Sequence, residues 1–413
     1  MIRILGLSEF EKIVRRRQGT LDDAEAVVAP ILEAVRREGD AALLRYARQF
    51  DSIGDQPLRV PQDELIAAAL NMNHAVWTAA ETARNHIHAF AVTQIPSEHT
   101  TEFSPGRQLG QIVRPIEAAG CYIPSGRYPL PSTLLMTAVP AQAAGVTRIV
   151  VTTPNPSPEI LGCAHMLGLT DVFRVGGAQA IGAMAFGTES VPKVDRIVGP
   201  GNVYVAAAKK LLAGETGIDF IAGPTEILIL ASEGRPAWIA ADILAQAEHD
   251  TDACAILITT SRSLAEQVAA EIERQIETLP TYATARIAID TNSAIFIAPD
   301  TDEAVELANR FAPEHLSLLD PSLLPKIRHA GTVFLGESSP ESAGDYAAGP
   351  SHVLPTNGMA RLRGGLSALD FVKVIAVQQL SHRALLDLAP TITVLARSEG
   401  LEAHARSVEI RFA

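Results

Sequence analysis

The chain has 413 residues, of which 47% are hydrophobic and 20% charged, and this is the composition of a folded globular protein rather than a disordered or fibrous one. Its length exceeds what a single hydrophobic core usually supports, so we expect two or more domains. The formal net charge of −13 comes without a basic stripe along the sequence, which argues against nucleic acid as a partner.

Cysteine usage and hydropathy indicate the compartment. Cys121, Cys163 and Cys254 lie far apart without a metal-binding spacing, which is typical of a reducing compartment, and we expect each to be a small buried residue. The chain has no run of about 18 apolar residues, and its first residues do not follow the signal-peptide pattern. The sequence therefore predicts a cytoplasmic protein without a membrane partner.

Helices are expected through the first hundred residues. Residues 20–50 and 63–92 carry apolar side chains at three- and four-residue spacing, which is typical of amphipathic helices. After residue 115, short β-branched runs alternate with helical stretches, and this alternation predicts βαβ units with a largely parallel sheet. The β-branched runs are residues 148–154, 171–177, 194–201 and 219–232.

The alternation continues to residue 319, so the chain has enough predicted strands for two α/β sheets. Helices are expected at residues 236–250, 263–279 and 302–311, with strand-like runs between them. The tail, residues 391–413, is expected to form a strand or linker and then a short helix. The predicted fold class is therefore α/β.

Two glycine clusters follow predicted strands, and parallel sheets bind ligands beyond the carboxyl ends of their strands. GGAQAIG begins at Gly176 and GPGNVY begins at Gly199, and neither matches the GxGxxG dinucleotide fingerprint. GPGNVY also opens a helix, so its free N–H groups could face an anion such as a pyrophosphate, or it could be a tight turn that binds nothing. The residues alone leave both interpretations open.

A second constellation is QAEHD, which places Gln246 and His249 on one face of a predicted helix, where they could reach one ion. A helical histidine is more often a satisfied polar residue, and glutamine alone is a weak zinc ligand. Further donors come later in the chain, with Asp345 and His352 in a loop rich in Ser, Gly and Pro and His404 in a terminal helix. On the residues alone, a metal site and ordinary solvated positions both remain open.

The segment APEHLSLL places Glu314 and His315 side by side after Pro313. Adjacent side chains on a strand point to opposite faces, so both reach one site only at a strand end or bend, which the proline supplies. A carboxylate and an imidazole held close together in a cleft can act as two separate proton carriers. The pair is therefore a candidate for acid–base chemistry.

Six segments together closely resemble the histidinol dehydrogenase family, in the family's order and over most of the chain after residue 115. They are CYIPSGRYPLPSTLLMTAVPA, VGGAQAIGAMAFGTESVPKVDRIVGPGNVYVAAAKK, DFIAGPTEILIL, QAEHDTDACAILIT, NRFAPEHLSLL and SPESAGDYAAGPSHVLPT. The resemblance implies two incomplete Rossmann-like domains with parallel sheets, plus small N- and C-terminal helical or tail domains that mediate dimerisation. The implied domains are residues 20–118 with 226–366, residues 119–225 on the NAD side, and residues 1–19 with 367–413 at the dimer contact.

The resemblance also implies a reaction, the NAD- and zinc-dependent four-electron oxidation of L-histidinol to L-histidine through bound L-histidinaldehyde, which ends histidine biosynthesis. It implies two NAD+ per turnover, one zinc per site and a homodimer whose sites are shared between subunits. By motif, Glu314 and His315 would be catalytic. Zinc would be held by Gln246, His249, Asp345 and, from the partner subunit, His404. NAD would contact Tyr122, Gln179 and Asn202. The substrate would contact Thr225, His352 and Glu399, as well as His315 and the four zinc ligands.

This chain departs from the family pattern at two places, with PSG at residues 124–126 where the family has PGG, and Thr225 where it has serine. Threonine keeps the hydroxyl and adds a methyl group, so the shape of the pocket, and with it the exact substrate, is affected. Together with Arg127, these changes leave open a dehydrogenase on the same scaffold that oxidises another small polar alcohol, such as a sulfonated diol, to its acid. A zinc hydrolase is an alternative from a different class, and NAD binding would separate the two because a hydrolase has no use for NAD. A non-catalytic binding module is disfavoured, because every chemically active position of the family is occupied.

Overall fold

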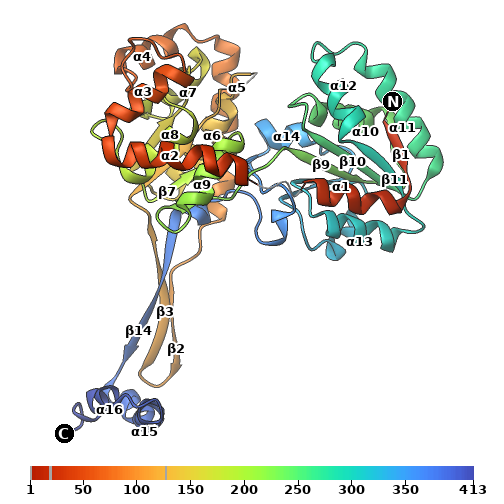
Figure 1. Cartoon of the computed structure of the whole chain (residues 1–413). Helices are drawn as coiled ribbons and strands as arrows, with labels where there is room; N and C mark the ends of the chain where they lie inside the picture. The colour runs from red at the N-terminus through yellow and green to blue at the C-terminus, as the bar shows by residue number, and fades with distance from the viewer. Residues whose placement is uncertain (1, 18–20, 126–127) are drawn as a thin grey trace. The chain divides into compact units, whose positions relative to one another are not determined.

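The structure, a computed structural model, describes residues 2–17, 21–125 and 128–413, and they form two compact units. The larger unit contains the chain up to Gln94 together with Glu117–Phe371, and it holds two parallel sheets. The smaller unit contains Ile95–Ile116 and Val372–Ala413, with an antiparallel sheet and two helices (Figure 1). The predicted α/β class with parallel sheets is confirmed. Among the described residues, no helix is both long and apolar enough to cross a membrane.

One parallel sheet of the larger unit has five strands in the order β6-β5-β4-β7-β8. Its central strand β4 (Ala118–Tyr122) is fully buried, and the small residues of AAGCY let helix α8 (Gly177–Phe186) pack closely, because a Cβ at Gly120 would lie 2.6 Å from the sulfur of Met184. The other elements are β5 (Arg148–Thr152), β6 (Asp171–Phe173), β7 (Arg196–Val198), β8 (Gly217–Ile218), α6 (Pro131–Ala143), α7 (Pro158–Met166) and α9 (Val203–Leu212).

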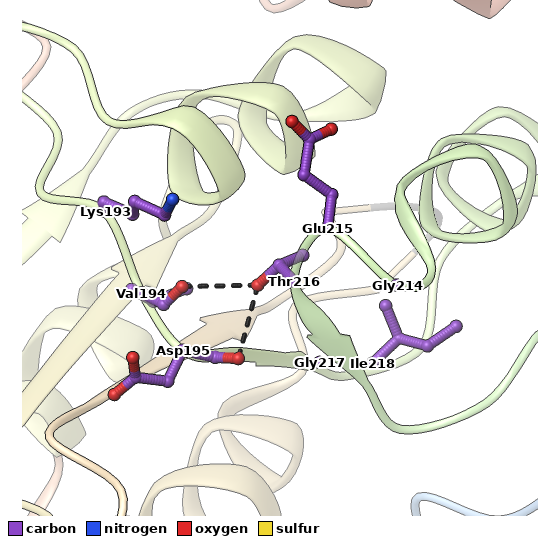
Figure 2. Close-up of a pocket in the computed structure, with 8 residues that line it drawn as sticks. All are labelled: Lys193, Val194, Asp195, Gly214, Glu215, Thr216, Gly217 and Ile218. Atoms are coloured by element: carbon purple, nitrogen blue, oxygen red, sulfur yellow. Dashed lines mark hydrogen bonds between the residues drawn. The ribbon is translucent and has the colours of Figure 1, made fainter. Parts of the chain in front are cut away.

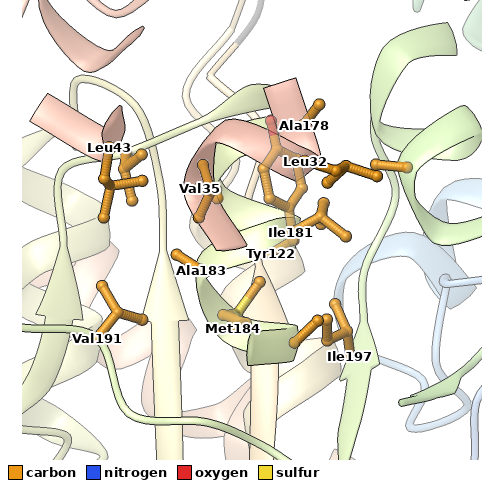
Figure 3. Packing of buried hydrophobic residues seen from close by; sticks show 14 of the residues in the cluster. Leu32, Val35, Leu43, Tyr122, Ala178, Ile181, Ala183, Met184, Val191 and Ile197 are labelled. Atoms are coloured by element: carbon orange, nitrogen blue, oxygen red, sulfur yellow. The ribbon is translucent and has the colours of Figure 1, made fainter. Parts of the chain in front are cut away.

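The first four long helices confirm the predicted helical segments, and they complete this lobe. Leu32 and Val35 of α2 (Asp22–Glu38) belong to the same buried cluster as Ile181 and Met184 of α8, as Figure 3 shows. The remaining helices are α3 (Asp40–Phe50), α4 (Gln62–Asn71) and α5 (His74–Thr93). Residues 22–50 therefore share a core with the five-stranded sheet, whereas the expected grouping placed residues 20–118 with the other sheet.

The second parallel sheet has six strands in the order β1-β11-β10-β9-β12-β13. Helices cover both faces, so a central strand such as β9 is apolar on both sides: Ile227 and Ile229 pack with α10–α12, while Leu228 and Leu230 pack with α1 and α13. The strands are β1 (Arg3–Leu5), β9 (Glu226–Leu230), β10 (Cys254–Thr259), β11 (Ala294–Ile297), β12 (His315–Leu318) and β13 (Thr332–Leu335). The helices are α1 (Phe10–Arg17), α10 (Pro236–Ala247), α11 (Arg262–Ile276), α12 (Tyr282–Thr291), α13 (Thr301–Phe311) and α14 (Glu341–Tyr346).

The N-terminal segment also differs from the expected grouping, which placed residues 1–19 in a tail domain. Arg3–Leu5 pairs with β11 as an edge strand, and Phe10 packs edge-on against Phe296 within the core. The exact domain boundaries stay a prediction.

The smaller unit is a long antiparallel ribbon with a helical pair. Strand β3 (Arg107–Pro115) pairs with β14 (Val372–Leu380) on one side and β2 (His99–Ser104) on the other. The helices are α15 (His382–Ser398) and α16 (Glu402–Glu409). The expectation of a strand or linker from residue 391 was wrong, because TITVL continues a helix that Ser381 caps by accepting a hydrogen bond from the N–H of Ala384.

All three cysteines are buried, as predicted. Burial raises the pKa of Cys121 and of Cys163 to about 12, so these two thiols stay protonated at neutral pH. The cysteines are therefore packing residues.

Candidate functional site

The chemically active side chains of the larger unit gather at the amino-terminal ends of strands in the six-stranded sheet. His315 begins β12, Glu226 begins β9, and Gln246 lies in the last turn of α10. His249 follows the end of that helix in a turn, rather than lying on the helix as predicted. The glycine clusters, in contrast, lie at the carboxyl ends of strands in the five-stranded sheet.

Glu314 lies at a bend directly before β12 and His315 is the first residue of that strand, as their position after Pro313 predicted. Ala312 adopts the left-handed conformation (φ +50°), which is unusual for a residue with a side chain and turns the chain sharply after α13. Oε2 of Glu314 accepts hydrogen bonds from the Thr225 hydroxyl (2.7 Å) and the Glu226 N–H (2.8 Å). The Glu226 carboxylate in turn accepts the N–H of Glu314 (3.3 Å). These bonds fix the carboxylate of Glu314 against β9.

The hydrogen bond to the His315 ring sets its tautomer. Nδ1 lies 3.1 Å from the carbonyl oxygen of Glu226, which can only accept, so Nδ1 carries the proton. Nε2 then has the lone pair, has no hydrogen-bond partner among the described residues, and lies 3.8 Å from Oδ1 of Asp345. The ring is 4% exposed, and burial lowers its pKa to about 4. His315 is therefore a neutral base at pH 7.

A candidate metal site lies beside this base. His249, Glu341 and Asp345 each present a ligand atom, and the three atoms lie within 4.8 Å of one another. Asp345 lies on α14, not in the loop that was expected, and Glu341 is one helical turn before it. The sequence reasoning missed Glu341, although the spacing of acids in ESAGDY could have indicated it.

Gln246, the other predicted ligand of this unit, is buried between Thr225 and Glu341. With its NH2 group toward Glu341, the amide donates to that carboxylate at 2.6 and 3.1 Å, and its oxygen lies 2.8 Å from the Thr225 hydroxyl. This orientation gives the NH2 group an acceptor, and the single proton of the Thr225 hydroxyl can go to the amide oxygen or to Glu314, but not to both. The structure therefore brings Gln246, His249 and Asp345 together with the candidate catalytic pair.

The electrostatics of the site favour a bound cation. Burial, and then neighbouring carboxylates, raise the pKa of Glu341 well above its usual range, and burial also raises that of Glu314. Burial raises the pKa of Asp242, one turn before Gln246 on α10, to about 6. Buried carboxylates at this density are unfavourable unless a cation balances them. An imidazole and two carboxylates form a donor set that zinc accepts, so the residues fit a zinc ion.

His352 lies on the other side of Asp345. Its Nδ1–H donates to the carbonyl oxygen of Asp345 (2.9 Å), and the hydroxyl of Thr133 on α6 lies 3.1 Å from its Nε2. A cavity of about 10 Å³ lies among His315, Asp345 and His352, which is room for about one water molecule. A substrate would therefore have to displace side chains on entering here.

The three predicted NAD contacts lie at the carboxyl ends of β4 and β7 and on α8. The Tyr122 hydroxyl accepts the N–H of Gly177 (3.1 Å), and Gln179 donates to Asp51 (3.1 Å). Oδ1 of Asn202 caps α9 by accepting the N–H groups of Tyr204 and Val205, both at 3.1 Å. Asp51 also accepts the N–H of Gly176 at 2.9 Å, and the sequence reasoning missed it. The predicted NAD residues thus border the two glycine clusters.

Glu399 and His404 lie in the smaller unit, Glu399 directly after α15 and His404 on α16, and both are exposed there. Their assignment to the site stays a prediction. Gly126 and Arg127, on which the altered-pocket interpretation partly rests, lie outside the described residues.

Another hollow of the larger unit lies away from these residues, at the amino-terminal edge of the five-stranded sheet (Figure 2). It has a volume of about 510 Å³. The Thr216 hydroxyl there donates to the carbonyl oxygens of Val194 and Asp195, and Asp195 itself accepts the N–H groups of Glu117 and Ala118. These hydrogen bonds join residues at the starts of β4, β7 and β8 and so stabilise the edge of the sheet, and this hollow is therefore not the candidate site.

The fold and the site define a class of protein: an α/β oxidoreductase in which a parallel-sheet lobe with glycine-rich strand ends accompanies a lobe with a metal-ligand cluster and a buried base. Residues 14–412 match the family model described as histidinol dehydrogenase. A protein named histidinol dehydrogenase from Syntrophotalea carbinolica is 45% identical over 100% of this chain and 99% of its own length, and one from Geobacter sulfurreducens is 45% identical over 98% and 97%. The crystal structure of histidinol dehydrogenase from Elizabethkingia anophelis superposes with a TM-score of 0.95 at 37% identity, covering 100% of this chain and 98% of that one. The chain therefore belongs to the histidinol dehydrogenase family.

Proposed function

We propose that this protein oxidises L-histidinol to L-histidine in two NAD-dependent steps, with zinc in the site and L-histidinaldehyde held between the steps. The observation that carries the proposal is His315, whose neutral ring turns an unpaired Nε2 toward Asp345 and the metal-ligand cluster. A base placed there can receive the proton of an alcohol that is held at the cluster.

Zinc would be held by Gln246, His249 and Asp345, with His404 of the partner subunit as fourth ligand. When bound, zinc would orient the substrate and polarise the group that is oxidised, and NAD+ would accept hydride. The amide of Gln246 suits this role because its NH2 group is held by Glu341, and its oxygen, which lies 2.8 Å from the Thr225 hydroxyl, has a second lone pair for an ion.

The protein residues then divide the proton transfers. In the first oxidation Nε2 of His315 takes the hydroxyl proton as hydride leaves the carbon, giving the aldehyde. Before the second oxidation, His315 would release that proton to solvent and a fresh NAD+ would replace the NADH. Glu314 then takes a proton from the water that attacks the aldehyde carbon, and His315 takes the proton of the resulting hydroxyl as the second hydride passes to NAD+. The raised pKa of Glu314 makes its carboxylate a stronger base than an exposed one, since burial disfavours the charged form.

Substrate recognition is assigned to Thr225, His352 and Glu399. Carboxylates crowded around the site suit a substrate that carries an amine and an imidazole, which is the chemistry of histidinol. A sulfonated diol would need extra cationic groups, and Arg127, which could supply one, lies outside the described residues. Histidinol is therefore the substrate that the residues and the family both favour.

We also propose that the protein is a homodimer whose smaller unit carries the contact. Its helices expose large apolar side chains, among them Val394 (67% exposed), Leu395 (57%) and Ile410 (71%). An apolar surface of this kind on a small unit is typical of a protein interface. Because Glu399 and His404 lie in the same unit, dimerisation would deliver them to a partner's site.

The test is the number of NADH molecules formed per L-histidinol consumed at limiting substrate, with and without a zinc chelator. We expect two NADH per alcohol, activity lost on chelation, and activity restored by added zinc but not by magnesium. One NADH per alcohol would contradict the second oxidation. Full activity in a chelated enzyme that contains no measurable zinc would contradict the metal.

A further inference from the structure

We propose that Lys209 and Asp219 are positioning residues for the cofactor loop, residues 199–202, and that they do this by holding both backbone polar groups of Gly199. The inference rests on the NAD-dependent function proposed above. It concerns two residues for which the sequence reasoning gave no role.

The two side chains form an ion pair beneath the loop and clamp Gly199 between them. Nζ of Lys209, which lies on α9, donates to the carbonyl oxygen of Gly199 at 2.8 Å. Oδ2 of Asp219, just after β8, accepts the N–H of the same glycine at 2.8 Å, and its Oδ1 accepts the N–H of Phe220 at 2.6 Å. One ion pair thus satisfies both the donor and the acceptor of a single loop residue.

This pair is fully buried, with the lysine side chain 2% exposed and the aspartate 0%. Removing two charges from water is costly, and a well-packed apolar pair would often be at least as stable. An apolar pair, however, could not bind the N–H and C=O of Gly199, which would then be buried without partners. The position of the charges therefore points to a role in holding the backbone.

The backbone they hold has a conformation that needs support. Gly199 has φ of +115°, and a Cβ built on it would lie 2.1 Å from the carbonyl oxygen of Tyr122. The loop thus passes directly against the end of β4, at one predicted NAD contact, and ends at Asn202, which is another. Asn202 is fixed by capping α9. With the ion pair at one end and the cap at the other, the loop has a fixed conformation. The N–H of Val203, at the start of α9, is not taken by the Asn202 side chain and is held in a defined direction, as in loops that bind phosphates.

A purely structural ion pair would stabilise the fold without affecting the cofactor, and one set of variants separates the two roles. Lys209→Met leaves Asp219 buried without its counter-ion and removes the donor to Gly199. The double variant Lys209→Met/Asp219→Asn removes the unpaired charge but does not return that donor. Asp195→Asn is the matched control, because Asp195 also accepts two backbone N–H groups at 2.9 Å, but at the other edge of the same sheet.

The measurements are the dissociation constant for NAD+ by calorimetry, zinc content, and the melting temperature, all on the full-length holoenzyme. We expect Lys209→Met to melt lower and to bind NAD+ about 10-fold more weakly or worse, the size expected for a lost charged hydrogen bond. The double variant should recover most of the melting temperature while NAD+ binding stays weak, and Asp195→Asn should bind NAD+ normally. If Lys209→Met does not fold, the double variant carries the same test.

Three results would overturn the inference. NAD+ affinity that returns together with the melting temperature in the double variant would make the pair a stability element only. NAD+ affinity within about twofold of wild type in that variant would also show that the pair only stabilises the fold. Loss of a hydrogen bond that positions the loop should weaken NAD+ binding by more than twofold. A wild-type enzyme that holds zinc yet does not bind NAD+ would overturn the proposed function, and this inference with it.

Discussion

Replacing Glu314 with glutamine should separate the two proposed oxidations. In the variant the side-chain oxygen can stay at the position of Oε2, where it keeps the hydrogen bonds from the Thr225 hydroxyl (2.7 Å) and the Glu226 N–H (2.8 Å). The new NH2 group takes the place of the other carboxylate oxygen. The geometry of β9 and of the bend before β12 is therefore retained, and what is lost is the ability to accept a proton.

The magnitudes follow from this difference. A neutral group of the same shape replaces a buried acid, so the free energy of unfolding should change by about 1 kcal/mol or less. Loss of a general base slows the step it serves by ~10²–10⁴-fold, which corresponds to about 3–5 kcal/mol of activation free energy. Only the attack of water on the aldehyde uses Glu314 in the proposed division, so the first oxidation should keep its rate.

The assay is a rapid-mixing single turnover with enzyme in excess over L-histidinol and saturating NAD+. Wild type should form two NADH per alcohol, whereas Glu314→Gln should form the first at the wild-type rate and the second ~10²–10⁴-fold more slowly. His315→Asn is the comparison variant, because it should slow both phases. If Glu314→Gln slows the first phase as much as the second, the assignment of Glu314 to the second step is wrong.

The metal cluster, the buried imidazole and the ligand from the partner subunit each give a further prediction. Glu341→Ala removes the acceptor that orients Gln246, so zinc affinity, measured by competition with a chromophoric chelator, should fall about 10–100-fold; an unchanged affinity would contradict this role. Because burial holds the pKa of His315 at about 4, below its ordinary 6.5, the folded protein binds fewer protons than the unfolded chain in that window, and stability is lost as the pH falls. In urea unfolding of the metal-free protein, wild type should lose about 3 kcal/mol more than His315→Gln between pH 7 and pH 4, and parallel curves would refute this. Co-expression of His404→Ala and His315→Asn chains should recover roughly a quarter of wild-type activity. Half of the dimers would contain one chain of each kind, and each mixed dimer would have one intact site out of two. Co-expressed chains that stay inactive would argue against a shared site.

Much of the fold could be predicted because its strands are buried on both faces. Runs such as ILIL in β9 and CAILI in β10 are apolar throughout, and they alternate with amphipathic helices of ordinary length. The candidate metal ligands in QAEHD and the bend at Pro313 could also be predicted, because each depends only on residues that are neighbours in the sequence. These features need only short windows of sequence, and the structure places Gln246, His249, Glu314 and His315 in one site.

The features that could not be predicted depend on contacts between distant segments. Asp51 reaches Gly176, and Asp219 reaches Gly199, across separations at which no spacing rule applies. The segment around Asp345 resembles a loop in composition, yet packing forms the short helix α14 that brings Glu341 beside Gln246. In the tail, β-branched residues favour a strand locally, but the cap at Ser381 and the apolar face of α15 stabilise a helix there.

Asp219 and Thr225 lie only six residues apart, and that short connection limits how far the reaction's two halves can separate. One of its ends is bonded to the loop at residues 199–202, and the other to the carboxylate of Glu314. A fully extended peptide of this length reaches about 20 Å, so this connection alone sets an upper limit on the distance between the proposed cofactor loop and the bond to Glu314. Lengthening the connection by insertion would raise that limit.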